Sequence, residues 1–259
     1  MDINIIGSGN VAWHLAHRLF ECGYTIRTVY SRTEKNAKAL AQQVQAAAIN
    51  DVAQLPPADI NILSLKDEVY VDVVAQIPSS EAVYVHTSGC MNAEILSKLG
   101  ENFGVLYPFQ TFNKKKQVDF STIPVCVEAS NDTTLQKLQT IAATIGGSVN
   151  CLNMRQRLHL HLAGVIASNF TNALYGMAKE ILDKENIDFD IIKPLIKETA
   201  AKVDYLHPYD AQTGPASRKD WNIINRQIAM LDNDHQRNLY LYLTQTIQEQ
   251  QAKRKNEEL

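Results

Sequence analysis

A glycine-rich turn follows the first apolar run of the chain and precedes a helical segment. It reads Gly7-Ser8-Gly9-Asn10-Val11-Ala12, a G-x-G-x-x-A pattern. In this setting the first glycine permits a tight turn, the second lets backbone approach a pyrophosphate, and the alanine permits close packing of helix on strand. The helix N-terminus offers free N–H groups and a positive dipole end to phosphates. We expect a dinucleotide-binding turn whose contacts are Gly7, Ser8, Gly9, Asn10 and Val11; a turn that merely joins strand to helix is the alternative.

The end of the second expected strand bears on which dinucleotide binds. An NAD site usually places Asp or Glu there to accept the ribose hydroxyls, whereas this chain reads Tyr30-Ser31-Arg32-Thr33. The Arg32 guanidinium can stack on adenine and pair with a 2′-phosphate, and Ser31 and Thr33 add hydroxyl donors. These residues indicate NADP rather than NAD. The alternative assigns Arg32 to the solvated surface and Thr33 to the N-cap of the next helix, and Thr33 can do both.

Three further strand ends should face the same crevice, because ligands of such sheets bind beyond the carboxyl ends of the strands. They read Ser64-Leu65-Lys66-Asp67, His86-Thr87-Ser88-Gly89 and Tyr107-Pro108-Phe109-Gln110-Thr111. The residues expected to contact the cofactor are Ser64, Leu65, Lys66, Thr87 and Ser88. A surface position for Lys66 and an ordinary turn at residues 87–89 are the alternatives. Lys114-Lys115-Lys116 is interpreted as a solvated loop without a role.

Polar residues recur on one face of a long, mostly apolar helical run, residues 155–183. At about 100° per residue, His161, Ser168 and Asn172 share this face, and Asn169 lies about 80° to its side. Because an unpaired buried polar group costs about 1–3 kcal/mol, these groups should find partners or face a cavity. We predict His161 as the acid–base group, with Asn169 and Asn172 as orienting or oxygen-binding groups. A core histidine with one hydrogen bond is the alternative.

A second polar turn lies far along the chain, at Thr213-Gly214-Pro215, with Arg218 close by in sequence. Exposed N–H groups beside a guanidinium are the chemistry that binds a carboxylate or phosphate. We therefore expect this turn to bind an anionic substrate if it faces the cleft. A turn that begins a helix, next to a surface arginine, is the alternative.

The elements that must position these residues change character near residue 152. Before it, short β-like runs alternate with amphipathic stretches, as in βαβ units with a mostly parallel sheet. The expected strands are 3–6, 25–30, 60–65, 82–86, 104–107, 123–127 and 148–152, and the expected helices are 11–20, 34–45, 67–76, 92–99 and 132–145. After it, helices are expected at 155–183, 188–203, 219–231 and 235–252, and a frayed or solvated end at 248–259. We predict an α/β fold: a Rossmann-like NADP-binding domain at residues 1–152, then an all-helical substrate or dimerisation domain at residues 153–259.

Composition excludes several classes of partner. The chain has 259 residues, 45% of them hydrophobic and 20% charged, which suits an ordinary folded core. Its net charge of −3 provides no basic field for nucleic acid, and no run of about eighteen apolar residues indicates a membrane span. The four cysteines show no C-x-x-C pair, and the histidines show no metal-ligand spacing. We expect a cytoplasmic protein without a metal and without nucleic-acid or membrane partners.

Five motifs in a fixed order give the chain a family resemblance over nearly its whole length. They are Gly7 to Ala12, Val85 to Gly89, Tyr107 to Phe112, His161 through Phe170, and Thr213 to Arg218. The set resembles NADP oxidoreductases that join a Rossmann-like domain to a helical C-terminal domain of unknown function, relatives of pyrroline-5-carboxylate reductase and of the 6-phosphogluconate and 3-hydroxyacid dehydrogenases. The resemblance implies an NADP-binding N-domain, a helical domain that often dimerises, and an active site between the two.

The chain departs from the 3-hydroxyacid dehydrogenases at one informative position. Those enzymes use a Lys with an Asn one turn later on the first long helix of the second domain, where this chain has His161. We therefore do not expect alcohol oxidation of their kind. The glycine-rich turn and the polar face of the long helix instead predict an NADP(H)-dependent oxidoreductase that transfers hydride to or from a small, anionic imine or carbonyl substrate. The resemblance implies a homodimer through the C-terminal helices. A non-catalytic NADP-binding or sensing module is the alternative.

Overall fold

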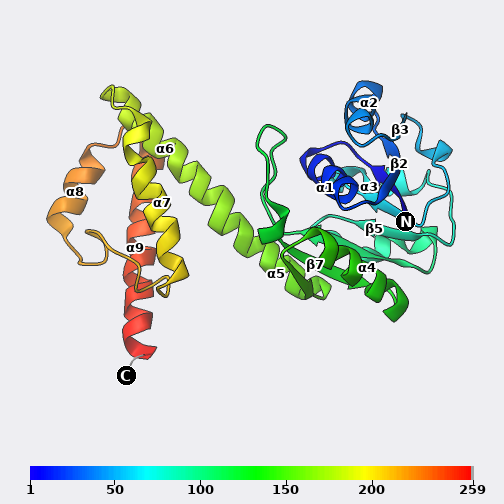
Figure 1. The fold of residues 1–259 in the computed structure, drawn as a ribbon. Helices are drawn as coiled ribbons and strands as arrows, with labels where there is room; N and C mark the ends of the chain where they lie inside the picture. Colours follow the sequence, from blue (N-terminus) through cyan, green and yellow to red (C-terminus); the bar gives the residue numbers. More distant parts are fainter. Residues whose placement is uncertain (258–259) are drawn as a thin grey trace. The chain divides into compact units, whose positions relative to one another are not determined.

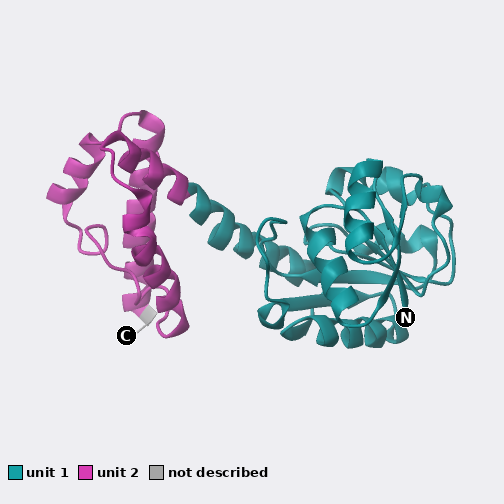
Figure 2. Cartoon of the chain, turned by 45° about the horizontal axis from the view of Figure 1, so that its top comes forward, with its two compact units in different colours: residues 1–173 teal, residues 174–259 magenta. Residues whose placement is uncertain are grey.

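The computed structural model describes residues 1–257 and divides the chain into two compact units, residues 1–173 and the residues from 174 onward (Figure 2). The first unit contains a sheet of eight strands with its helices, and the second is helical (Figure 1). Among residues 1–257, no helix combines the length and the apolar character needed to cross a lipid bilayer.

The sheet is mostly parallel, as predicted. Its strands are β1 (Asp2–Ile6), β2 (Thr25–Tyr30), β3 (Ala47–Ile49), β4 (Ile60–Leu63), β5 (Val83–His86), β6 (Phe103–Pro108), β7 (Pro124–Ala129) and β8 (Ser148–Cys151). They lie in the order β3-β2-β1-β4-β5-β6-β7-β8, and only the β6–β7 pair is antiparallel. From β1 the chain runs to β2 on one side and later to β4 on the other. That reversal of strand order creates a crevice at the carboxyl ends of the strands.

Two hydrophobic clusters bury the two faces of the sheet. One joins the strands to α1 (Asn10–Glu21), α2 (Glu34–Gln43) and α4 (Asp132–Ile145); the other joins them to α3 (Tyr70–Val74) and the 3-10 helix Ala93–Leu99. Because both faces are covered, β1 and β4 are buried at nearly every position. Their two buried asparagines pair with each other, since Asn4 donates to the Asn61 side chain at 2.9 Å. The helices expected at 67–76 and 92–99 are shorter or tighter than predicted, with 3-10 turns at Asp67–Val69 and Ala93–Leu99.

A single long helix runs from Met154 to Lys184 and contains one widened turn. It consists of α5 (Met154–Gly164), a π-helical turn (Val165–Phe170) and α6 (Thr171–Lys184). Asn153 and Gln156 form a capping box at its start, which satisfies two backbone N–H groups. A π turn bonds residue i to i+5, so side chains beyond it leave the phase of a regular α-helix. The uniform α-helical spacing assumed between residues 161 and 172 is therefore wrong.

The described part of the second unit is built from helices, which confirms the predicted helical C-terminal region. Beyond α6 it contains α7 (Lys193–Ala201), α8 (Trp221–Ala229) and α9 (Asp234–Glu257). The Asp220 carboxylate caps α8 by accepting the N–H of Ile223. For the frayed or solvated end expected at 248–259, the frayed alternative is wrong as far as Glu257, since α9 continues through it. The solvated alternative agrees with the exposed positions between residues 249 and 256, and residues 258–259 lie outside the described part. The helical region begins at Met154, while the compact units divide after Ala173.

Candidate functional site

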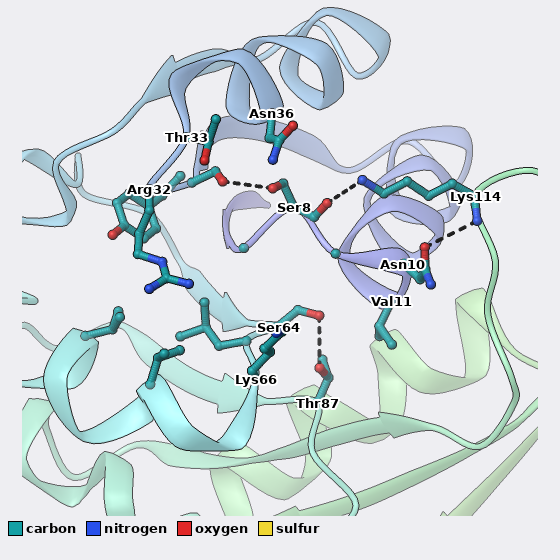
Figure 3. Close-up of a pocket in the computed structure, with 17 residues that line it drawn as sticks. Ser8, Asn10, Val11, Arg32, Thr33, Asn36, Ser64, Lys66, Thr87 and Lys114 are labelled. Carbon is teal, nitrogen blue, oxygen red and sulfur yellow. Dashed lines mark hydrogen bonds between the residues drawn. The ribbon is translucent and has the colours of Figure 1, made fainter. Parts of the chain in front are cut away.

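A cavity of about 690 Å³ opens above the glycine-rich turn, at the carboxyl ends of the central strands (Figure 3). This is the edge where strand order reverses, the position at which doubly wound sheets bind ligands. All residues predicted to contact the cofactor line this cavity except Ser88. The lining is Gly7, Ser8, Gly9, Asn10, Val11, Tyr30, Ser31, Arg32, Thr33, Asn36, Ser64, Leu65, Lys66, Val69, Val73, Thr87 and Lys114.

The glycine-rich turn leaves space and donors for phosphates. Gly7 has φ +126°, and a Cβ there would stand 2.1 Å from the carbonyl oxygen of Ser64, so no other residue fits. Gly9 is the N-cap of α1, so no N-cap side chain bonds the N–H groups of the first turn, and a Cβ on Gly9 would meet nothing within 4 Å among residues 1–257. Free N–H groups at a helix N-terminus beside open space suit a pyrophosphate. The residues present therefore fit the expected dinucleotide.

The side chains predicted to distinguish NADP from NAD lie along one side of this cavity. Arg32 directs its guanidinium into the cavity, and no carboxylate within residues 1–257 pairs with it (Figure 3). The hydroxyl of Ser8 donates to that of Ser31 at 2.9 Å, which joins the strand end to the glycine-rich turn. Thr33 takes the N-cap position of α2 but makes no side-chain cap bond, so its hydroxyl is available to a ligand. Asn36, which sequence reasoning missed, adds an amide to this side.

The remaining predicted contacts divide between the cavity and a turn. Thr87 is buried and donates from its hydroxyl to the Ser64 hydroxyl at 3.1 Å, so both lie on the floor of the cavity. Lys66 is exposed at the cavity edge. The Ser88 hydroxyl instead accepts the backbone N–H groups of residues 90 and 91, each at 3.1 Å. The Ser88 hydroxyl therefore stabilises its own turn, in agreement with the alternative of an ordinary turn at residues 87–89.

A second cavity, of about 400 Å³, lies between the end of β6 and the start of the long helix. Gly164 lets the helix approach the loop after β6, because a Cβ there would stand 2.8 Å from the ring of Phe109. Both sides of the cavity belong to the first unit. Its lining residues are Tyr107, Phe109, Gln110, Thr111, His161, Gly164, Val165, Ala167, Ser168 and Asn169.

His161 and Tyr107 form a hydrogen-bonded pair in this second cavity. The Tyr107 hydroxyl lies 3.0 Å from Nδ1 of His161. Gly89 makes room for them, since a Cβ there would stand 2.5 Å from that nitrogen. Burial raises the pKa of Tyr107 to about 12, so the phenol stays protonated at neutral pH. His161 is half-buried and lines the cavity, so it is not the core histidine of the alternative interpretation.

A buried ion pair fixes the helix that carries His161. Arg157, one turn earlier, is 1% exposed and pairs with the Glu128 carboxylate of β7 through Nη2 at 3.0 Å and Nε at 3.3 Å. Its Nη1 also donates to the carbonyl oxygen of Ser88 at 3.0 Å. The guanidinium therefore joins the helix to both β7 and the turn that contacts His161. Sequence reasoning missed Arg157, because α5 begins with two arginines, Arg155 and Arg157, and their order in the sequence does not show which one is buried.

His86 is a buried neutral imidazole beneath the same turn. Its Nδ1 accepts the N–H of Ser88 at 3.2 Å, and Nε2 has no partner within the described residues. Burial lowers the pKa of His86 to about 3, and the positive charge of Arg157 lowers it further in the same direction. His86 thus stays uncharged at neutral pH and supports the turn rather than transferring protons.

Two family models match separate parts of the sequence. Residues 2–88 match a family described as NADP oxidoreductase, coenzyme F420-dependent, and residues 123–247 match a domain of unknown function, DUF2520. No curated protein matches the sequence. A solved structure from Bacteroides fragilis, assigned as an NADP oxidoreductase, is 42% identical, with a TM-score of 0.88 over 96% of this chain and 98% of that one. The chain belongs to this family of NADP oxidoreductases.

Two more distant structures share the fold of the oxidoreductase. 1-Pyrroline-5-carboxylate reductase from Streptococcus pyogenes is 12% identical, with a TM-score of 0.65 over 95% of this chain and 98% of that one. Imine reductase from Myxococcus stipitatus in complex with NADP⁺ is 15% identical, with a TM-score of 0.64 over 96% and 92%. At these identities the likeness establishes the fold alone. The family assignment confirms the predicted resemblance and the NADP cofactor.

The other predicted site residues of the oxidoreductase are only partly brought together. Asn169 lines the second cavity with His161, whereas Asn172 does not, because the π turn shifts the residues that follow it. Arg218 and the turn that begins at Thr213 belong to the second unit, where Arg218 is exposed. Their contact with a substrate stays a prediction.

Proposed function

We propose that the oxidoreductase transfers hydride between NADP(H) and a small compound with a C=N or C=O bond, and that Tyr107 and His161 manage the accompanying proton. The observation that carries this proposal is the 3.0 Å contact between their polar atoms inside a cavity. A phenol and an imidazole in contact can exchange a proton, which is the chemistry of general acid–base catalysis.

Protein residues supply the proton that must accompany hydride transfer. The nicotinamide, when bound, supplies the hydride to the carbon of the double bond. The nitrogen or oxygen of that bond then needs a proton, and Tyr107 retains one at neutral pH. A proton given up by either member of the pair is replaced through the other, because their polar atoms are in hydrogen-bond contact. In the oxidative direction the same pair accepts the proton.

The lining of the second cavity suits the uncharged part of a substrate. Phe109 and Val165 provide apolar surface, and Gln110 and Asn169 provide amides that can orient a polar group. We therefore propose that this cavity binds the C=N or C=O bond of the substrate. The anionic group expected from the sequence stays a prediction, with the turn at Thr213 and Arg218 as its expected contact. Asn169 is assigned the orienting role predicted for it.

The first cavity supports the cofactor contacts predicted from the sequence. We propose that the turn from Gly7 to Val11 binds the pyrophosphate and that Ser31, Arg32 and Thr33 bind the 2′-phosphate. The residues from Ser64 to Lys66, with Thr87, then border the remainder of the dinucleotide. The open N-terminus of α1 and the unpaired Arg32 guanidinium are the observations that support these roles.

The test is NADPH consumption by the purified protein with a panel of cyclic imines, ketones and aldehydes. Tyr107→Phe and His161→Ala should each lower kcat by about 10²- to 10⁴-fold, because each removes half of the proton relay. NADPH affinity should stay within about twofold, since neither residue lines the first cavity. His159→Ala is the matched control, because His159 is exposed on the same helix and bonds only its own backbone turn. Unchanged kcat in both pair variants would show that the proton comes from elsewhere.

A second copy of the chain is the partner we propose for an exposed stripe on the long helix. Leu158, Leu162, Ile166 and Phe170 are 37%, 57%, 54% and 59% exposed and recur every four residues. Contiguous apolar surface of this kind marks an association site, and a two-fold dimer brings the same patch together from both copies. Sedimentation should give a dimer for wild type and a monomer for the double variant Leu162→Glu, Ile166→Glu. Val71→Glu, at an equally exposed apolar position in α3, should stay dimeric.

The cysteines are consistent with a reducing compartment. All four, Cys22, Cys90, Cys126 and Cys151, are free thiols. Because disulfides are rare where thiols are kept reduced, we propose a cytoplasmic location. Localisation of a fluorescently tagged chain would test it.

A further inference from the structure

We propose that Lys114 binds the pyrophosphate of NADP and that the loop which carries it, residues 109–119, closes the cofactor cavity over the glycine-rich turn. The inference rests on the proposed cofactor site. It gives a role to a lysine for which the sequence suggested none.

Lys114 is in direct contact with the phosphate-binding turn. Its ammonium donates to the carbonyl oxygen of Ser8 at 2.6 Å, and its backbone N–H donates to the Asn10 side chain at 3.4 Å (Figure 3). The side chain lines the same cavity as the glycines and the first residues of α1. A residue distant in sequence therefore delivers a cation to the N-terminus of α1.

The charge of Lys114 is available to an anion. An ammonium has three donors, and the contact with Ser8 uses one of them. No carboxylate in residues 1–257 lies within ion-pair distance of it, and the ring of Trp13 lies 5.1 Å away, which favours a cation at this spot. The dipole end and free N–H groups of α1 attract negative charge to the same place. A pyrophosphate oxygen at this position would accept hydrogen bonds from the Lys114 ammonium and from the N–H groups of α1.

Packing of the loop on α1 fixes the position of Lys114. The Nε2 atom of buried His14 lies 3.0 Å from the carbonyl oxygen of Asn113, and the ring of Phe112 packs 5.4 Å from that imidazole. The side chains of Lys115 and Lys116 are exposed like that of Lys114, but they make no hydrogen bond or ion pair with the described residues. The structure thus distinguishes one lysine of the three and offers the other two as controls.

The same loop also contributes to the second cavity. Phe109, Gln110 and Thr111 line it, and Lys114 follows within the same loop. A pyrophosphate bound at Lys114 would therefore order the residues that border the substrate. Cofactor binding and the shape of the substrate cavity are then coupled through one segment.

The test is calorimetric titration of wild-type protein and Lys114→Met with NADPH and, separately, with NADH. Methionine keeps an unbranched apolar stem beside Trp13 and removes the charge. Because both nucleotides contain the pyrophosphate, their affinities should fall by the same factor, about tenfold to hundredfold. Lys115→Met and Lys116→Met should bind as wild type does, and the melting temperature without nucleotide reports whether Lys114→Met is folded. Hydrogen exchange should show NADPH protecting residues 109–116 in wild type and protecting them less in Lys114→Met.

Each outcome decides the proposal. An equal loss of affinity for NADPH and NADH in a folded Lys114→Met variant supports the proposal. Affinity equal to that of Lys115→Met, or loss for NADPH with none for NADH, overturns it; the second result would assign Lys114 to the 2′-phosphate. Wild-type protein that binds neither nucleotide would overturn the proposed cofactor site together with this inference.

Discussion

Gly89 lies so close to His161 that a single methyl group would separate the imidazole from its partner. A Cβ on Gly89 would stand 2.5 Å from Nδ1 of His161 and 3.0 Å from the ring of Tyr107. Gly89→Ala must therefore displace one or both rings. Since a displacement of about 1 Å can cost about 10²-fold in rate, we expect kcat to fall by that order while NADPH affinity is unchanged.

Gly176→Ala is the control for that substitution, because a Cβ at Gly176 in α6 meets nothing within 4 Å. It should leave kcat unchanged and leave stability equal or higher, since alanine favours a helix over glycine. A Gly89→Ala enzyme with wild-type kcat would contradict the role of the pair.

Arg32 should determine the choice between NADPH and NADH. Arg32→Ala removes the unpaired guanidinium on the side of the cavity assigned to the 2′-phosphate. We expect the Kd for NADPH to rise by about tenfold to hundredfold and the Kd for NADH to stay the same. Fluorescence titration of both nucleotides measures this, with Lys35→Ala, an exposed cation in the first turn of the helix that follows Arg32, as control. An equal loss for both nucleotides would remove the basis for the assignment.

Arg157 should contribute far more to stability than the exposed ion pairs do. Arg157→Met leaves the Glu128 carboxylate and the carbonyl of Ser88 without their donor. We expect the free energy of unfolding to fall by about 3–5 kcal/mol, measured by urea denaturation. Lys38→Met removes an exposed pair with Glu34 and should cost at most about 1 kcal/mol. Similar losses in the two variants would show that Arg157 is not a buried anchor.

His86 should make the protein less stable in acid. The pKa of His86 is about 3 in the folded protein and near the ordinary histidine value of about 6.5 in the unfolded chain, so the unfolded chain binds one more proton between these values. The contribution is complete above the unfolded value and is lost as pH falls toward the folded one, by about 1.4 kcal/mol for each pH unit. The midpoint of urea denaturation should therefore fall less steeply with decreasing pH, between about pH 7 and pH 4, in His86→Gln than in wild type. Equal slopes would show that His86 does not remain neutral.

Residue types and their spacing were sufficient to predict most of the residues that line the first cavity. The turn at Gly7 and the loop at Arg32 are local in sequence, and the carboxyl ends of parallel strands necessarily meet at one edge. Ser88 was misplaced because strand-end position alone does not say whether a hydroxyl faces a ligand or caps its own turn. Asn36 was missed because it lies inside α2 rather than at a strand end.

The second cavity depends on contacts that sequence spacing does not reveal. Tyr107 meets His161 across 54 residues, and Arg157 meets Glu128 across 29. Lys114 reaches Ser8 over 106 residues. The sequence of residues 165–170 does not predict the π turn that they form. This turn changes which amide side chains share a helix face with His161. These features arise from packing between distant segments.

The tripeptide that follows β5 has a consequence for the timing of the two transfers. Thr87 lines the first cavity, the carbonyl of Ser88 accepts a hydrogen bond from Arg157, and Gly89 lies against Tyr107 and His161. Two peptide bonds separate Thr87 from Gly89, so a thermal displacement of one residue is transmitted to the other through the backbone. The distance between the floor of the first cavity and the Tyr107–His161 pair should consequently fluctuate less than either does against the rest of the sheet. With NADP bound as proposed, this would let hydride and proton transfer occur within one encounter.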